Sequence, residues 1–541
     1  MRRPSARRLF EAFEAHVPAR LRAEVKRRYR REKRTRPLHS GDATRDEPRR
    51  RLPRFAALGE VGPLPIRLHP ITSGTRRRAP RPDLCLAAPG SLDGVLDGLL
   101  AAEEEAVPLV CIARNEEDLD SEVAGCSTAI AVASEGLVPR AEQVVPREFV
   151  VVSPTVIATR DLPVAGLRDA PASEVLLLDH DGGSSRFPDP IRPVHLDPAT
   201  PPQGLAAAAR TAAAVVAPKA EAPPEVVAAA ATLAACGVPV VGPTDDHHPL
   251  DGLATAIAAH DLLPRRVEAA VARLASDVGT ARVAAVRARR YALTTLSAGA
   301  FVRGMLEVAR LPTTPTSVSA VVRVGDVAHL PDLRASLARQ RVTPTEVVLV
   351  VPPELAAAVR MARPALPWPG RMVLDGRLWL SRAVGATTSR YVALLDSDNV
   401  YGPDHLGDLL ATLESTGAAM VGRNAHFQHD PSSGGCLAVP GTEEGQAGWL
   451  VPGTTLLARS RAASVTRGGQ VRTERDLQRR VGQRGGRLYA LHPYGFLRGG
   501  VASSGAATPD RARPWEDAFP EGAGGVPFIP ASTAPLRTDR A

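Results

Sequence analysis

Between residues 81 and 312 the chain alternates short runs of β-branched and aliphatic residues with longer alanine-rich runs. Such alternation is typical of a parallel sheet that carries helices on both faces. We therefore expect a Rossmann-like α/β domain over residues 81–312, which ends in helices at about 264–310. The predicted strands are residues 107–113, 148–153, 174–179, 213–218 and 237–243.

A second α/β pattern covers residues 313–500. Residues 317–324 form an apolar run suited to a buried strand, and residues 347–351 form another. The segment between them has leucines at 330, 333 and 337 on one helical face, which completes a βαβ unit. The sequence thus predicts an α/β protein with two Rossmann-like domains.

The two ends of the chain differ from this body. Residues 1–54 hold 19 Lys/Arg and 7 Asp/Glu, a balance of +12, so the rest of the chain carries about −3 of the total of +9. Apolar residues spaced three or four apart predict an amphipathic helix there, followed by a linker rich in Pro and Arg. We expect a basic helical leader and linker over 1–80 and a flexible C-terminal tail over 501–541.

Three hypotheses remain open for the basic leader. The leader is a solvated helix that docks on its own protein, a segment that lies on an anionic membrane surface, or a segment that binds nucleic acid. Nucleic acid is the least favoured partner, because the remaining chain is nearly neutral and aromatic residues make up only 4% of the sequence.

Cysteine spacing and hydropathy predict where the protein is located. The five cysteines lie far apart without a CxxC pair, which disfavours a zinc site and a disulfide framework. The sequence has no apolar run of the roughly 18 residues that a transmembrane helix needs. We expect a cytoplasmic protein, with peripheral attachment at the inner face of the cell membrane as the alternative.

Two carboxylates follow the predicted strand at 391–395. Asp396 and Asp398 stand two residues apart in the segment DSDN, at the end of the sheet where ligands bind in open parallel sheets. Such a pair is suited to Mg²⁺ or Mn²⁺, which prefer oxygen ligands. Two other Asp-x-Asp triplets, at 118–120 and 179–181, are rivals, but only the third follows a complete βαβ unit.

The C-terminal segment SVSAVVRV…LRASLARQ…EVVLVV…SRAVGATTSRYVALLDSDN resembles the family 2 glycosyltransferases of the GT-A fold over about 185 residues. The resemblance implies metal-dependent transfer of a sugar from a nucleotide-diphosphate donor to a glycan or lipid-linked acceptor in bacterial cell-surface polysaccharide or glycoconjugate synthesis. The family's nucleobase-contacting Asp after the second strand is missing here. Asp375 and Arg382 are therefore candidates, with Asp396, for contacting the nucleotide-sugar. A looser likeness links residues 218–243 to the sugar-nucleotide half of GT-B glycosyltransferases.

The same resemblance suggests further site residues near the C-terminus. The family's acidic helix corresponds to residues 472–491, which makes Glu474 the first candidate for the base of an inverting transfer and Asp476 the second. His492 is a candidate third metal ligand, and Arg498 a candidate contact for the diphosphate. Trp449 has two interpretations, stacking on a sugar face or packing in the core.

The altered motifs leave one alternative of a different class. A catalytically inactive protein that binds nucleotide-sugar, or a scaffold for partner enzymes, fits the same two α/β domains. Metal binding without turnover of any nucleotide-sugar would favour that alternative.

Overall fold

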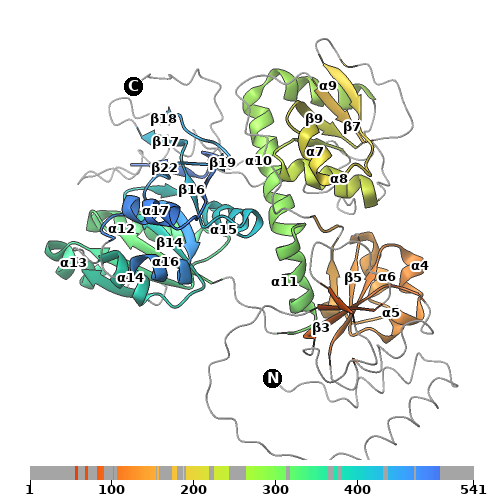
Figure 1. Cartoon of the computed structure of the whole chain (residues 1–541), viewed down its shortest axis with the longest axis horizontal. Coiled ribbons are helices and arrows are strands. Elements are labelled where there is room, and N and C mark those ends of the chain that lie inside the picture. Colours follow the sequence, from red (N-terminus) through yellow and green to blue (C-terminus); the bar gives the residue numbers. More distant parts are fainter. Residues whose placement is uncertain are drawn as a thin grey trace, which may run out of the picture.

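The computed structural model describes three α/β units along the chain (Figure 1). The described residues are 55–58, 68–70, 82–90, 102, 107–133, 135–153, 155–157, 174–178, 187, 191–217, 224–242, 264–311, 317–362, 370–374, 379–429, 436–467 and 471–499. The predicted basic leader and the predicted tail therefore lie outside the described residues. No helix in the described ranges combines the length and apolar character needed to cross a bilayer.

The N-terminal unit, residues 55–153, is built on a six-stranded parallel sheet of order β2-β1-β3-β4-β5-β6. Its first two strands lie inside the segment predicted as a linker, so that prediction was wrong for residues 55–58 and 68–70. Both strands are too short to carry a periodic signal. The elements are β1 (Phe55–Leu58), β2 (Leu68–Pro70), β3 (Leu84–Ala87), β4 (Leu109–Ala113), α4 (Glu116–Leu119), α5 (Glu122–Cys126), β5 (Ala129–Val132), η2 (Glu135–Leu137), α6 (Val138–Ala141), η3 (Arg147–Phe149) and β6 (Val150–Val152).

The middle unit, residues 174–308, has its own four-stranded parallel sheet of order β10-β9-β7-β8. The strands expected in one sheet over 81–312 are therefore divided between two sheets. The elements are β7 (Glu174–Leu177), β8 (Arg192–His195), α7 (Pro202–Ala208), β9 (Ala212–Val216), α8 (Pro224–Ala235), β10 (Val240–Val241), α9 (Pro264–Ser276), α10 (Val278–Thr295) and α11 (Ala298–Val308).

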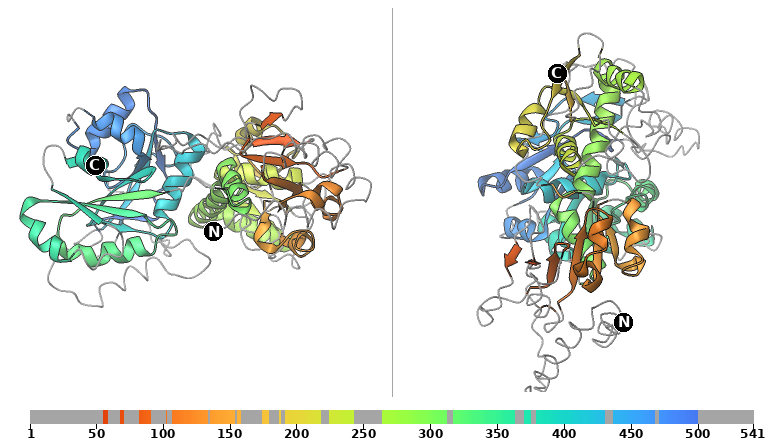
Figure 2. Two further views of the ribbon diagram at one scale, coloured as in Figure 1. Left: turned by 90° about the horizontal axis from the view of Figure 1, so that it is seen from below. Right: turned by 90° about the vertical axis from the view of Figure 1, so that its right-hand side faces the viewer.

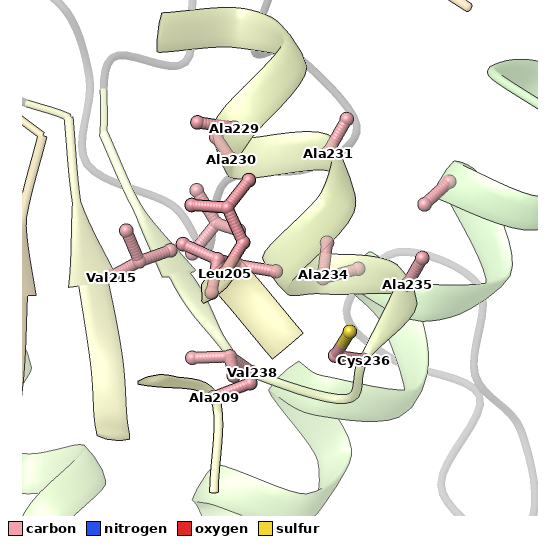
Figure 3. Close-up of a cluster of buried hydrophobic side chains, with 14 of the residues drawn as sticks. Leu205, Ala209, Val215, Ala229, Ala230, Ala231, Ala234, Ala235, Cys236 and Val238 are labelled. Carbon is pink, nitrogen blue, oxygen red and sulfur yellow. The ribbon is translucent and has the colours of Figure 1, made fainter. Parts of the chain in front are cut away.

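Alanine side chains make up much of the buried layer between α8 and the middle sheet. Figure 3 shows Ala229, Ala230 and Ala234 of α8 packed over Val215 and Leu205. Small side chains allow a helix to approach a sheet closely, which suits a core built with few aromatic residues.

Helix α11 joins the first two units. Phe301, Met305 and Leu306 of α11 are buried in one cluster with Phe55 and Leu84 of the N-terminal sheet. Figure 1 shows α10 and α11 in succession, with α11 beside the N-terminal unit. The preceding helix α10 packs on α8 and also on α15 of the C-terminal unit.

The C-terminal unit, residues 317–499, contains a mixed eight-stranded sheet of order β13-β12-β11-β14-β20-β16-β21-β19. Strands β11 to β14 are parallel, and β20 joins β14 in the antiparallel sense. The elements are β11 (Val318–Arg323), η5 (Val327–His329), α12 (Leu330–Ala338), β12 (Glu346–Val351), η6 (Pro353–Leu355), α13 (Ala356–Ala362), β13 (Gly370–Leu374), α14 (Trp379–Ala386), β14 (Tyr391–Asp396), α15 (His405–Thr416), β16 (Met420–Arg423), β19 (Gly445–Gln446), β20 (Thr454–Ala458), α16 (Arg459–Thr466), α17 (Glu474–Gln483) and β21 (Leu488–Leu491).

Helices cover both faces of this sheet, as Figure 2 shows. Alternate residues of β11 point to opposite faces and therefore belong to different clusters. Val318, Ala320 and Val322 pack in the cluster that includes α12 and α15. Val321, between them in sequence, packs in the cluster that includes α14. The prediction of a Rossmann-like α/β fold for the C-terminal unit is confirmed.

A small second sheet, of order β15-β22-β17-β18, lies at the end of the C-terminal unit. It packs against α10 of the middle unit, because Val286 is buried with Phe427, Tyr494 and Leu497. Its strands are β15 (Val400–Tyr401), β17 (His426–His429), β18 (Cys436–Val439) and β22 (Phe496–Arg498).

Candidate functional site

Strand β14 carries Asp396 to the carboxyl end of the parallel part of the sheet. There Asp396 pairs in register with Arg323, the last residue of β11. The Ser397 backbone N–H donates to the Arg323 carbonyl at 2.9 Å, and the buried Ser397 hydroxyl accepts from the Gly325 N–H at 3.1 Å. These bonds fix the turn that presents Asp396 and, one residue beyond Ser397, the exposed Asp398.

Tyr401 stabilises this turn. Its buried hydroxyl accepts from the Asp396 N–H at 2.8 Å and lies 2.8 Å from the Gly453 carbonyl, to which it can donate. The buried Asn399 side chain accepts from the Gly499 N–H at 3.0 Å. The loop before β20 and the end of β22 are thereby tied to the turn that carries the two aspartates.

Gly453 brings a third carboxylate, Glu474, to the same place. The Gly453 N–H donates to Glu474 Oε2 at 2.9 Å, and the Thr455 hydroxyl donates to Glu474 Oε1 at 2.5 Å. Gly453 has a φ of +78°, and a Cβ atom on it would lie 2.5 Å from Asp396 Oδ2. Only glycine fits between these two carboxylates without strain.

The carboxylates affect one another's ionisation. Burial, helped by the negative charge of Asp396, raises the pKa of Glu474 to about 8, against the hydrogen bonds from Thr455 and Gly453. Burial and the charge of Asp398 raise the pKa of Asp396 to about 6, although Arg323 and Arg498 act in the opposite direction. Burial and the neighbouring carboxylate thus outweigh the two arginines in setting the pKa of Asp396.

A divalent cation would suit the two carboxylates on this turn. Asp396 and Asp398 present hard carboxylate oxygens on one turn, and Mg²⁺ or Mn²⁺ would offset the charge of Asp398 that raises the pKa of Asp396. Within the described residues no three His, Cys, Asp or Glu side chains form a complete metal-binding group. A cation here would draw its other ligands from water or from a bound diphosphate, which is usual for Mg²⁺.

Of the residues predicted to contact the nucleotide-sugar, Arg498 lies near Asp396, whereas Arg382 is not placed beside it. Arg498 is near, because its charge lowers the pKa of Asp396. Arg382 is exposed on α14, and the charges that act on Asp396 come from Arg323 and Arg498. Asp375 lies outside the described residues.

Asp476 has a structural role at the start of α17. It forms a capping box with Thr473: the Thr473 side chain accepts from the Asp476 N–H, and the Asp476 carboxylate accepts from the Thr473 N–H. Its other oxygen pairs with Arg479 at 2.8 Å. Glu474, in the first turn of this same helix, is the acidic residue that faces Asp396.

The contacts of His492 are with residues other than Asp396 and Asp398. The ring is buried, with Nδ1 2.9 Å from Arg423 Nη1 and Nε2 3.4 Å from Asp408 Oδ2. Burial, together with the charge of Arg423, lowers the pKa of His492, so the ring is neutral at pH 7. The prediction of His492 as a third ligand is corrected accordingly, because both ring nitrogens are engaged in this separate cluster.

That cluster, which we call the buried ion cluster, joins α10 of the middle unit to the C-terminal unit. Arg290 of α10 contacts Asp408 at 2.7 Å and Asp404 at 2.8 Å, and Arg289 contacts Glu444 at 2.9 Å. Burial alone would raise the pKa of Asp408, but Arg290 and a hydrogen bond with His492 outweigh it and hold the pKa well below its usual value.

Two features of the site were not predicted from sequence. Arg323 was overlooked, although a charged residue that ends an apolar strand is a recognisable signal for the carboxyl edge of a sheet. Gly453 was also overlooked, because its role depends on a contact with Asp396 that lies 57 positions earlier in the chain.

The rival Asp-x-Asp triplets have different positions. Asp118 accepts from the Arg114 N–H at 2.7 Å in the first turn of α4, and Asp120 pairs with Arg140. The triplet at 118–120 is therefore engaged in a helix cap and a surface ion pair, whereas the triplet at 179–181 lies outside the described residues.

Neither a protein-family model nor a curated protein sequence matches the chain. Among solved structures it is similar to S. aureus TarS 1–349 in complex with UDP-GlcNAc, with 13% identity and a TM-score of 0.28, over 35% of this chain and 60% of that one. The similarity to the longer S. aureus TarS structure has 15% identity and a TM-score of 0.27, over 35% of this chain and 37% of that one. A 4-diphosphocytidyl-2C-methyl-D-erythritol synthase from Anaerococcus prevotii gives 13% identity and a TM-score of 0.25, over 33% of this chain and 89% of that one.

The chain thus spans less than two thirds of the TarS structures that it matches. The TM-scores are below 0.5, so these likenesses do not decide the function of this chain.

Proposed function

We propose that the chain is a metal-dependent glycosyltransferase that moves a sugar, of the hexose type, from a nucleotide-diphosphate donor to an acceptor hydroxyl. The observation that carries the proposal is the convergence of Asp396, Asp398 and Glu474 at one sheet edge, where Gly453 separates two of the carboxylates. A conventional structural ion pair would neutralise such charges, whereas here the pKa values of Asp396 and Glu474 are raised.

Asp396 and Asp398 would hold Mg²⁺ or Mn²⁺. When bound, the cation supplies Lewis-acid stabilisation for the diphosphate leaving group. Arg323 and Arg498 add positive charge beside Asp396, where the phosphates of a donor would lie.

Glu474 is suited to taking the proton of the attacking hydroxyl. A base works best when its pKa is near the working pH, and burial brings the pKa of Glu474 to about 8. The bonds from Gly453 and Thr455 fix the orientation of its carboxylate. One carboxylate acting as the base is what an inverting transfer requires, so an inverting transfer is part of the proposal.

The acceptor class and the pathway rest on the family resemblance. On that basis we propose a glycan or lipid-linked acceptor in bacterial cell-surface polysaccharide or glycoconjugate synthesis. Peripheral membrane contact through the basic N-terminal segment, on the cytoplasmic side, is part of the same proposal, and nucleic acid is not.

The test is release of free nucleotide from a panel of nucleotide-sugars by the full chain, with Mn²⁺, with Mg²⁺ and with EDTA. We expect cation-dependent release from at least one donor, reduced about a hundredfold or more by Asp398→Ala. A matched control is Asp332→Ala, which removes an exposed carboxylate from the first turn of α12. Donor binding without release from any donor would contradict the enzyme proposal and favour the inactive binding protein or scaffold.

A further inference from the structure

Trp449 is an exposed aromatic residue directly before two buried residues. Its side chain is 47% exposed, whereas the next two residues, Leu450 and Val451, are fully buried. The other large apolar residues that are exposed in the described part of the chain are aliphatic: Val194, Met361 and Leu374. The position therefore excludes core packing as the role of Trp449.

The backbone around Trp449 is held by buried polar side chains. Asn424 donates to the Trp449 carbonyl at 2.9 Å, and Gln478 bonds both the N–H and the carbonyl of Leu450, at 2.8 and 2.9 Å. The Val451 N–H donates to the Arg423 carbonyl at 2.6 Å. An exposed indole on so rigid a support loses little conformational entropy when a ligand covers it.

The same segment leads directly to the proposed catalytic base. Gly453, four residues after Trp449, bonds Glu474, and Arg475 places its guanidinium carbon 5.9 Å from the centre of the indole ring. Arg475 adjoins Glu474 in α17, so Trp449 and the base are linked from two sides. The indole therefore lies beside α17, the helix whose first residue is Glu474.

We propose that Trp449 forms the platform of an acceptor subsite, on which a pyranose ring stacks with one hydroxyl directed toward Glu474. The C–H face of a pyranose is apolar and its rim is polar, which matches an aromatic ring set among hydrogen-bonding groups. The inference rests on the proposed glycosyltransferase activity and adds that the acceptor is a saccharide bound through Trp449.

Binding is tested first, without turnover. The full chain is saturated with UDP and Mn²⁺ and titrated with methyl hexopyranosides, while acrylamide quenching of tryptophan emission is recorded. Trp449→Phe serves as the reference, and its difference from the wild type isolates the emission of Trp449. We expect at least one glycoside to protect this emission from acrylamide, and protection by none of the panel would overturn the inference.

Turnover is tested with the protecting glycoside as acceptor. Trp449→Ala should raise the KM for the glycoside about tenfold or more, and Trp449→Phe should restore most of the affinity. The KM for the donor and nucleotide release without acceptor should not change. Val194→Ala, at an exposed apolar position on β8, is the matched control.

The binding and turnover experiments distinguish a failure of the saccharide subsite from a failure of the proposed glycosyltransferase activity. Protection of Trp449 without any nucleotide release would support the saccharide subsite and contradict the enzyme. Nucleotide release with an unchanged glycoside KM in Trp449→Ala would support the enzyme and overturn the subsite.

Discussion

Replacing Glu474 with glutamine should make the C-terminal unit less sensitive to alkaline pH. The pKa of Glu474 is raised from an ordinary 4.5 to about 8, mainly by burial. Between these two pKa values the folded state keeps a proton that the unfolded state has lost. The free energy of unfolding therefore falls as the pH rises from about 4.5, the pKa in the unfolded chain, toward 8. Glutamine has nearly the same shape and never ionises, so it removes this penalty.

The magnitude follows from the two pKa values. Each unit of difference is worth about 1.4 kcal/mol, so ionisation of Glu474 costs the wild type roughly 3 kcal/mol between about pH 5.5 and 8.5. This value is an upper bound, because part of the shift is shared with Asp396. We expect Glu474→Gln to recover between about 1 and 3 kcal/mol of unfolding free energy at the higher pH, relative to the lower.

Urea unfolding followed by tryptophan emission measures this effect. Three of the four tryptophans, at positions 368, 379 and 449, belong to the C-terminal region, so the emission reports mainly on that unit. Glu354→Gln, at an exposed position in η6, is the control and should keep the pH dependence of the wild type. An equal loss of stability with pH in the wild type and in Glu474→Gln would show that ionisation of Glu474 does not cause the pH dependence.

Three further predictions concern the ion cluster, the glycine and the base. Arg290→Met should destabilise the chain by about 3–5 kcal/mol in urea unfolding, because the buried Asp404 and Asp408 lose their nearest cation, whereas the more exposed Arg303→Met should cost about 1 kcal/mol or less. Gly453→Ala should lower nucleotide release about tenfold or more, since its Cβ would meet the Asp396 carboxylate, and Gly448→Ala, where a Cβ meets nothing within 4 Å, should not. Because Glu474 must be ionised to act as a base, the rate should rise with pH up to about 8, and a rate that falls over pH 6–8 would contradict its role.

Several residues of the candidate site could be predicted from local sequence patterns. The apolar strand that ends in Asp396 and Asp398 is visible as a run of residues, and so is the polar helix that begins at Glu474. The Thr-x-x-Asp spacing that makes Asp476 a cap is also local, and it could have separated the two acidic residues in advance.

Contacts between distant segments could not be predicted in this way. His492 is engaged by Arg423 and Asp408, at separations of 69 and 84 positions, and Arg290 approaches Asp408 from another unit. A single sequence gives the type of each residue but not the partner that decides its charge. The division of residues 81–312 into two sheets escaped prediction for a related reason, since one alternating pattern is compatible with either arrangement.

The proposed activity requires a divalent cation held by Asp396 and Asp398, and binding of Mn²⁺ can be measured without turnover. Electron paramagnetic resonance of free Mn²⁺ can be titrated with the full chain in the presence of UDP, for the wild type and for Asp396→Asn combined with Asp398→Asn. We expect saturable binding by the wild type, weakened about tenfold or more in the double variant. Equal Mn²⁺ affinity in the two proteins would contradict the proposed cation site.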